Sequence, residues 1–292
     1  MSHSLFYSVF NHSFQLSEQQ VDAAIVRELD MEQILVPVSD TTRAEQLVQL
    51  AVLIKDRSSS HPVVVLNVVP NSDQAESEVA GARKTLESVM SEAAAAEVQV
   101  KVKATIARNP AYGIARTATE IAADLIIVNL PRSDDALHKL LGEGMESVLR
   151  HSRKTVFVCN FQHATVKHMG LFVIAPPLAE LEVGFPVWAD KLIRLATELS
   201  VPLRLNCTQG THAAITALAK ERKVTLDLEF NEFADWEDFF IISRDLKDSD
   251  LIVLIAARKE GVSFNGHLQR LPVKLEKHFP DSSKILVYPQ SA

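Results

Sequence analysis

The sequence repeats one short run, because Asp124-Leu125-Ile126 in the first half returns as Asp250-Leu251-Ile252 in the second half. Around each copy, short runs rich in β-branched residues alternate with longer segments whose apolar residues recur at helical spacing, which is the pattern of βαβ units. The short runs are apolar at odd and even positions alike, as in strands that helices cover on both faces. The repeat therefore predicts two copies of one α/β unit.

Each unit is expected to contain five strands and four helices. In the first unit we expect strands at 34–39, 63–69, 98–107, 124–130 and 155–161, and helices at 41–55, 73–96, 110–123 and 135–151. In the second we expect strands at 169–175, 202–208, 224–233, 251–256 and 284–288, and helices at 186–200, 211–222, 236–247 and 268–279. The predicted fold class is α/β, with two tandem doubly wound five-stranded parallel sheets and helices on both faces.

The repeats also predict the domain organisation. We expect one domain at residues 32–161, a polar linker at 162–167 and a second domain at 168–292. Residues 1–31 lie outside both repeats and form an N-terminal tail, in which 17–29 could be an amphipathic helix.

The last strand of each unit would be an exposed edge if it stayed alone. We therefore expect the strands at 155–161 and 284–288 to pair with each other, which relates the two units by a pseudo-two-fold axis.

Composition excludes several classes of protein. Of the 292 residues, 47% are hydrophobic and 23% are charged, which is typical of a folded globular chain. The net charge of -7, from 30 Lys+Arg against 37 Asp+Glu, argues against a broad surface for nucleic acid or anionic lipid. Apolar runs such as 63–69 are far shorter than the ~20 residues needed to cross a bilayer. We expect no nucleic-acid partner and no direct membrane insertion.

The two cysteines, Cys159 and Cys207, lie in separate apolar runs and share no motif. Buried free thiols of this kind indicate a reducing compartment, so we expect a cytoplasmic protein.

Motifs for catalysis are absent from the sequence. No two histidines lie four apart on one expected helix, and there is no Gly-x-Ser-x-Gly, Gly-x-x-x-x-Gly-Lys or Gly-x-Gly-x-x-Gly. We therefore expect no metal site and no enzymatic activity, and a phosphatase or ATPase is the weakest of the alternatives because no general base accompanies a phosphate loop.

The loop after the fourth strand of the first unit is the expected ligand position, because doubly wound sheets bind ligands at the carboxyl ends of their strands. It contains Asn129, Arg132, Gly142 and Glu143. The unit resembles the universal stress protein family, whose ATP-binding members have Gly, two residues, Gly, nine residues, then Gly and Ser or Thr in this loop. The resemblance places Asn129 and Arg132 at the first two glycine positions. Gly142 keeps the third glycine, and Glu143 replaces the Ser or Thr.

The same resemblance points to Ser39 and Asp40. Ser39 stands where the family has an acidic residue that helps to hold the nucleotide, and Asp40 follows it. Side chains at Asn129 and Arg132 would fill the space in which glycine amides approach phosphate. A Glu143 carboxylate about 4 Å from a phosphate would cost on the order of 4 kcal/mol at an effective dielectric near 20, or roughly three decades of affinity. We therefore expect a degenerate nucleotide site with no cofactor, or at most weak binding of ATP with magnesium.

The second unit has no phosphate-loop glycines after its fourth strand. Instead it has Ala257-Arg258-Lys259-Glu260-Gly261-Val262-Ser263-Phe264, in which Arg258, Lys259 and Ser263 are the polar candidates. This run, the segment 235–239 and the closing segment 285–289 resemble the C-terminal domain of bacterial cation:proton antiporters, a soluble tandem of stress-protein-like units. The resemblance covers about residues 32–290. We expect the loop at 258–266 to serve structure or protein contact.

The resemblance implies a non-catalytic regulatory or binding module, similar to the soluble tail of a monovalent cation:proton (Na+/H+) antiporter. Its expected partners are the membrane part of the antiporter or a regulatory protein, with pairing between the two units and a homodimer as a further form. The alternative is a stand-alone tandem universal stress protein that binds ATP or another adenine nucleotide.

Overall fold

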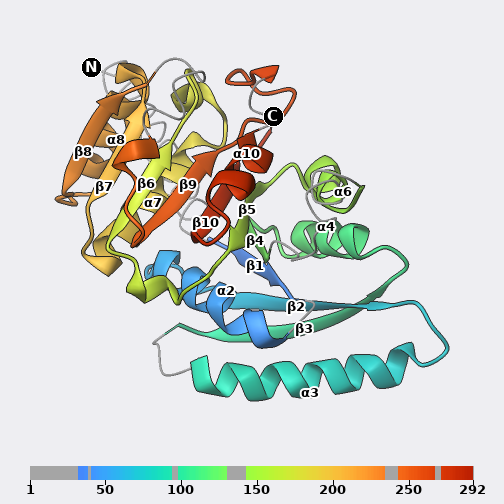
Figure 1. Cartoon of the computed structure of the whole chain (residues 1–292). Coiled ribbons are helices and arrows are strands. Elements are labelled where there is room, and N and C mark those ends of the chain that lie inside the picture. The colour runs from blue at the N-terminus through green and yellow to red at the C-terminus, as the bar shows by residue number, and fades with distance from the viewer. Residues whose placement is uncertain are drawn as a thin grey trace, which may run out of the picture. The chain divides into compact units, whose positions relative to one another are not determined.

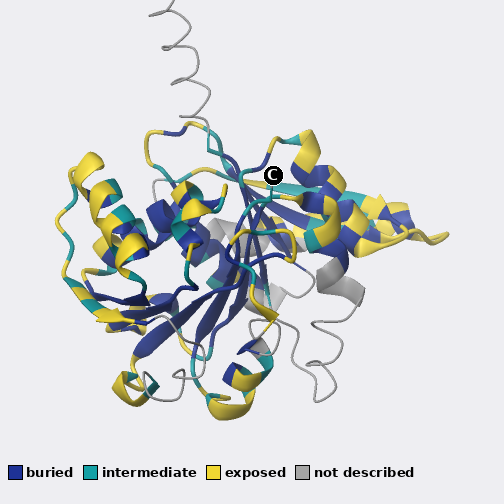
Figure 2. Ribbon diagram, turned by 90° about the horizontal axis from the view of Figure 1, so that it is seen from above, coloured by how far each residue is buried: buried dark blue, intermediate teal, exposed yellow. Residues whose placement is uncertain are grey.

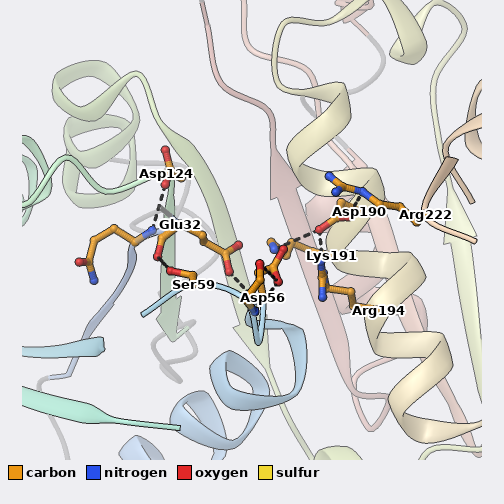
Figure 3. A network of polar contacts seen from close by, with 10 residues as sticks. Glu32, Asp56, Ser59, Asp124, Asp190, Lys191, Arg194 and Arg222 are labelled. Carbon is orange, nitrogen blue, oxygen red and sulfur yellow. Dashed lines mark hydrogen bonds and ion pairs between the residues drawn. The ribbon is translucent and has the colours of Figure 1, made fainter. Parts of the chain in front are cut away.

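The structure is a computed structural model of the chain. It describes residues 32–38, 41–93, 98–129, 143–233, 243–266 and 271–291. Contacts group residues 1–32 and 56–61 into a small unit, and residues 33–55 and 62–292 into a large one. Within the small unit, the backbone N–H of Asp56 donates to Oε2 of Glu32 at 2.6 Å, and the Ser59 hydroxyl donates to the Glu32 carbonyl at 2.9 Å (Figure 3).

The large unit alternates strands and helices in the expected order (Figure 1). Its first half contains β1 (Ile34–Pro37), α2 (Thr41–Ile54), β2 (Val63–Pro70), α3 (Ala75–Ala93), β3 (Val100–Ala107), α4 (Pro110–Glu120), β4 (Leu125–Asn129), α6 (Glu143–Ser152) and β5 (Thr155–Asn160).

Its second half contains β6 (Gly170–Ile174), α7 (Phe185–Leu199), β7 (Leu203–Cys207), α8 (Gln209–Glu221), β8 (Leu228–Glu232), β9 (Asp250–Ile255), α10 (Leu271–His278) and β10 (Lys284–Tyr288). Short 3₁₀ helices lie at η1 (Thr165–Lys167), η2 (Ala179–Leu181) and η4 (Ser243–Asp245).

All ten strands belong to one sheet, in the order β3-β2-β1-β4-β5-β10-β9-β6-β7-β8. Strands within each half are parallel, and β5 and β10 join the halves as an antiparallel pair in which Val158 lies opposite Leu286. The α/β fold class and the pairing of the two last strands are thus confirmed. Because these two strands pair, the five-stranded parallel sheets of the two halves share one continuous hydrogen-bond ladder of ten strands.

Helices cover both faces of the sheet, and each face has its own core (Figure 2). On one face, α2, α3, α7 and α8 pack on strand residues such as Val36 and Val173. On the other, α4 and α10 pack on residues such as Leu35 and Ile174. Neighbouring residues of one strand thus enter opposite cores, which explains why the strands are apolar at every position.

Some element bounds differ from the expected ones. Strand β8 begins at Leu228 rather than 224, because Lys223 has a positive φ of 55° and the N–H of Val224 caps α8 by donating to the Ala219 carbonyl. The expected helix at 236–247 ends differently, because its described residues form only the 3₁₀ turn η4 at Ser243–Asp245. Helix α10 is described from Leu271, with Pro272 in its first turn, where a missing N–H is harmless. The expected N-terminal tail 1–31 and helix residues 135–142, 236–242 and 268–270 lie outside the described part of the chain.

None of the helices in the described ranges is both long enough and apolar enough to cross a membrane.

Candidate functional site

The first-half nucleotide position is only partly described. Ser39, Asp40, Arg132 and Gly142 lie outside the described residues, as does the side chain of Glu143, whose backbone begins α6. Asn129 is the last residue of β4 and is half-buried at the carboxyl end of the sheet strands. Asn129 therefore lies at the expected edge of the sheet, and the role of all six residues in nucleotide binding stays a prediction.

Arg258 lies three residues beyond the end of β9, and its side chain is buried rather than displayed as a positive rim. Its Nε donates to the carbonyl oxygen of Pro289 at 2.7 Å. Its Nη1 donates to the carbonyl of Leu149 in α6, and its Nη2 donates to the carbonyl of Lys154, just before β5. One planar guanidinium therefore binds both halves of the chain through backbone carbonyls.

Burial lowers the pKa of Arg258 to about 10, while the nearby Glu260 and Tyr288 act in the opposite direction. The side chain thus stays protonated at neutral pH and can donate from all three nitrogens. Each of its three nitrogens already donates to a backbone carbonyl, so Arg258 serves as a structural clamp.

The loop at 257–266 is fastened by a carboxylate from the segment before α7. Oε1 of Glu182 accepts hydrogen bonds from the backbone N–H of Ser263 at 2.8 Å and from its hydroxyl at 2.6 Å. A Cβ at residue 261 would lie 2.5 Å from the same carboxylate oxygen, so a larger residue there would displace the Glu182 side chain. The third predicted residue, Lys259, is exposed in this loop.

A second carboxylate lies at the N-terminus of α8. Oε2 of Glu180 accepts from the Thr211 hydroxyl at 2.7 Å, and a Cβ on Gly210 would lie 2.6 Å from Oε1 of Glu180. Positive backbone dipoles at a helix N-terminus favour an anion, and in nucleotide-binding folds that anion is a phosphate. Here the chain supplies its own negative group.

Taken together, Arg258, Glu180 and Glu182 fill the carboxyl edge of the second half with internal contacts. The two carboxylates would repel a nucleotide phosphate, and the guanidinium is not free to attract one. Sequence reasoning selected Arg258 and Ser263 but missed Glu180 and Glu182. Their signal was weak, since two acidic residues in a loop before a helix are common on any protein surface.

Charged residues also cluster on α7. Nε of Arg194 and Nζ of Lys191 donate to Oδ2 of Asp190 at 2.9 and 3.2 Å, and Nε of Arg222 lies 3.0 Å from Oδ1 (Figure 3). Burial alone would raise the pKa of Asp190, but the three cations outweigh it and the pKa is lowered. Because Arg222 follows α8, the cluster links α7 to α8 and has a structural role.

The repeated aspartates at the start of the fourth strand of each half have different partners. Asp124 accepts from the backbone N–H of Gln33 at 3.0 Å (Figure 3). Asp250 instead forms a buried ion pair with Arg204 of β7 and accepts from the Lys247 N–H at 2.8 Å. Neither aspartate lies at the carboxyl edge, so both are structural.

Among the residues that the structure describes, no three His, Cys, Asp or Glu side chains are grouped so that they could hold a metal ion. Cys159 and Cys207 are free and buried, as expected. Burial raises the pKa of both thiols, that of Cys207 to about 12.

Comparison with known proteins agrees with this fold. Residues 31–160 match the model of the Universal stress protein family. No match was found among curated proteins.

Several solved structures resemble nearly the whole chain. A universal stress protein from Archaeoglobus fulgidus DSM 4304 has a TM-score of 0.57 at 12% identity, covering 88% of this chain and 96% of that one. The cytoplasmic domain of a prokaryotic cation chloride cotransporter has a TM-score of 0.59 at 14% identity, covering 89% and 96%. A putative universal stress protein from Pseudomonas aeruginosa UCBPP-PA14 has a TM-score of 0.56 at 13% identity, covering 89% and 94%. At these identities the likeness concerns the fold.

Proposed function

We propose that the chain is a non-catalytic regulatory or binding module that acts in the cytoplasm through protein contacts, in the manner of the soluble tail of a cation:proton antiporter. Its partner is then the membrane part of such a transporter or a protein that regulates it.

The observation that carries this proposal is the closed carboxyl edge of the second half. In a doubly wound fold this edge is where a ligand binds. Here Glu182 occupies the N–H and hydroxyl of Ser263, Glu180 occupies the N-terminus of α8, and Arg258 is committed to three backbone carbonyls. A half whose ligand position is occupied by its own side chains is suited to transmit or support an interaction between proteins.

Two similarities support a transporter as the partner. The sequence from 257 to 264 resembles antiporter C-terminal domains. A fold like that of the whole chain also occurs in the cytoplasmic domain of a cation chloride cotransporter.

The alternative is a tandem stress protein that binds ATP in its first half. It is favoured by the family match of residues 31–160. It is opposed by Asn129, whose side chain stands where a glycine would let the backbone approach a phosphate.

Calorimetric titration of the full chain with ATP, with and without magnesium, separates the two functions. We expect no saturable binding below the millimolar range, and no ATP hydrolysis. In Glu143→Ser, removal of the carboxylate should tighten any residual ATP binding by up to about three decades. The matched control is Glu221→Ser, which changes the charge equally at an exposed position in the other half and should leave first-half affinity unchanged. Micromolar ATP binding by the unmodified chain would establish the alternative.

A further inference from the structure

The ten-stranded sheet ends at two edge strands, β3 and β8, which lie at opposite ends of the strand order (Figure 1). Strand β3 pairs with β2 on its inner side and β8 pairs with β7, and within the described residues no strand lies beyond either. An edge strand carries a row of backbone donors and acceptors that can pair with another strand.

The two edges have opposite charge. On β3, Lys101 is exposed and Lys103 is partly exposed, with Lys103 bound to Glu120 of α4 at 2.6 Å. On β8, Glu229 and Glu232 are both exposed. Charges on an edge normally prevent pairing with other chains. Here they oppose the pairing of like edges and favour the pairing of unlike ones.

The faces of the two edges also match. Val100 and Val102 of β3 and Leu228 and Phe230 of β8 pack against the same core, so they lie on one face of the sheet. Because side chains alternate along a strand, Lys101, Lys103 and Glu229 lie on the opposite face. Two contacts agree with this placement, since Lys103 meets α4 and Glu229 lies 3.9 Å from Arg204, which stacks over Phe172 of the other core.

We propose that β3 of one copy of this chain pairs with β8 of a second copy as an antiparallel extension of the sheet. Pairing of two β3 edges would oppose lysine with lysine, and pairing of two β8 edges would oppose glutamate with glutamate, both of which are destabilising. Only the pairing of β3 with β8 places Lys101 and Lys103 beside Glu229 on one face of the sheet. On the other face, the same pairing places Val100 and Val102 beside Leu228 and Phe230.

The direction of the strands follows from the junction between the halves. Strands of the first half run opposite to those of the second, because β5 and β10 are antiparallel. A second copy displaced along the sheet therefore brings its β3 antiparallel to the β8 of the first copy, and the helical layers remain on the same sides. The contact is heterologous, so it repeats from copy to copy and forms linear assemblies.

The contact involves strands of 8 and 5 residues, which is short for a stable interface. Association should thus be weak, favoured by high protein concentration and weakened by salt, which screens the exposed charges. This interaction goes beyond the proposed function and depends neither on a transporter nor on a nucleotide.

Sedimentation velocity of the full chain tests the proposal at rising protein concentration, in about 20 mM and about 500 mM NaCl. We expect reversible oligomers that are larger at low salt. Lys101→Glu and Glu229→Lys should each raise the dissociation constant at least about tenfold, because one attractive pair becomes repulsive. Lys277→Glu in α10 and Glu221→Lys in α8 make the same charge changes at exposed positions outside both edge strands and should have no such effect.

Mixing the two edge variants gives the sharpest result. Lys101→Glu alone has glutamate on both edges, and Glu229→Lys alone has lysine on both, so each should be monomeric. An equimolar mixture again offers unlike edges and should associate, as should the double variant that carries both changes. Circular dichroism and thermal unfolding establish that each variant is folded.

A monomeric unmodified chain at all concentrations in low salt would overturn the proposal. So would oligomers that persist in both single edge variants, or a mixture that stays monomeric. If the edge strands bind a different protein and not a second copy of this chain, the unmodified chain would stay monomeric at all concentrations.

Discussion

Arg258, in the second half of the chain, donates a hydrogen bond to the carbonyl oxygen of Leu149, in α6 of the first half. The same side chain reaches the carbonyl oxygens of Lys154 and Pro289, so it joins the C-terminal turn of α6, the start of β5 and the end of β10. These segments meet where the two halves form their antiparallel strand pair. The clamp and the strand pair together explain how two units of one repeat become a continuous sheet.

Arg258→Ala should lower the free energy of unfolding by roughly 3 kcal/mol, because it leaves buried carbonyls without donors. Arg258→Lys should recover only part of this loss, since an ammonium cannot reproduce the planar fork. Urea denaturation measures both effects, and Lys259→Ala, at the exposed neighbouring position, should change stability by no more than about 0.5 kcal/mol. Equal effects of the substitutions at 258 and 259 would contradict the clamp. Any ATP affinity should be unchanged in Arg258→Ala.

Gly170→Ala tests the buried ion pair of Arg204 and Asp250. A Cβ at 170 would lie 2.5 Å from Nη2 of Arg204 and 2.7 Å from Oδ1 of Asp250, so the pair must separate to admit a methyl group. Separation of a buried pair should cost about 3 kcal/mol in the free energy of unfolding. The matched control is Gly81→Ala in α3, where nothing lies within 4 Å of the new Cβ and helix propensity should stabilise by up to about 1 kcal/mol. Equal thermal stability of the two variants would refute the steric argument.

The ion cluster at Asp190 should make stability depend on acid pH. The folded-state pKa of Asp190 is lowered, so the cluster contributes its full stability above the unfolded pKa of about 4 and loses it as the pH falls through the folded pKa. The difference in free energy of unfolding between the unmodified chain and Asp190→Asn should therefore be constant from about pH 5 to pH 8 and shrink below about pH 4. A difference that grows on acidification would reverse the assigned sign. Glu221→Gln, at an exposed position on α8, serves as the control.

Neither thiol should react in the folded protein. Cys159 and Cys207 are fully buried, and desolvation raises the pKa of each, so the thiolate that attacks a reagent is scarce. Titration with a chromogenic disulfide should detect no thiol under native conditions and both thiols after unfolding in guanidinium. Both thiols belong to the same core, so rapid labelling of the native chain would contradict this prediction and show that this core opens.

The alternation of apolar runs and helical segments was enough to predict the α/β class and the order of the strands and helices. The pairing of β5 with β10 could also be predicted, because each half ends in an apolar strand that would otherwise be exposed. The fold class, the order of the elements and this strand pairing depend on the spacing of apolar residues along the chain and on the burial of apolar surface. Both can be read from the residue types and their spacing in the sequence.

The contacts of Arg258 and Glu182 at the carboxyl edge of the second half could not be predicted from the sequence. Arg258 binds carbonyls 104 and 109 residues away, and every residue has such a carbonyl, so no residue type marks these partners. Glu182 likewise meets Ser263 across 81 residues. From the sequence, Arg258 and Lys259 therefore looked like a positive rim at the end of the strand, and Glu180 and Glu182 gave no signal. The folded chain turns them inward because the sheet, once continuous, brings distant backbone groups within hydrogen-bonding distance and buries them, and buried polar groups require partners.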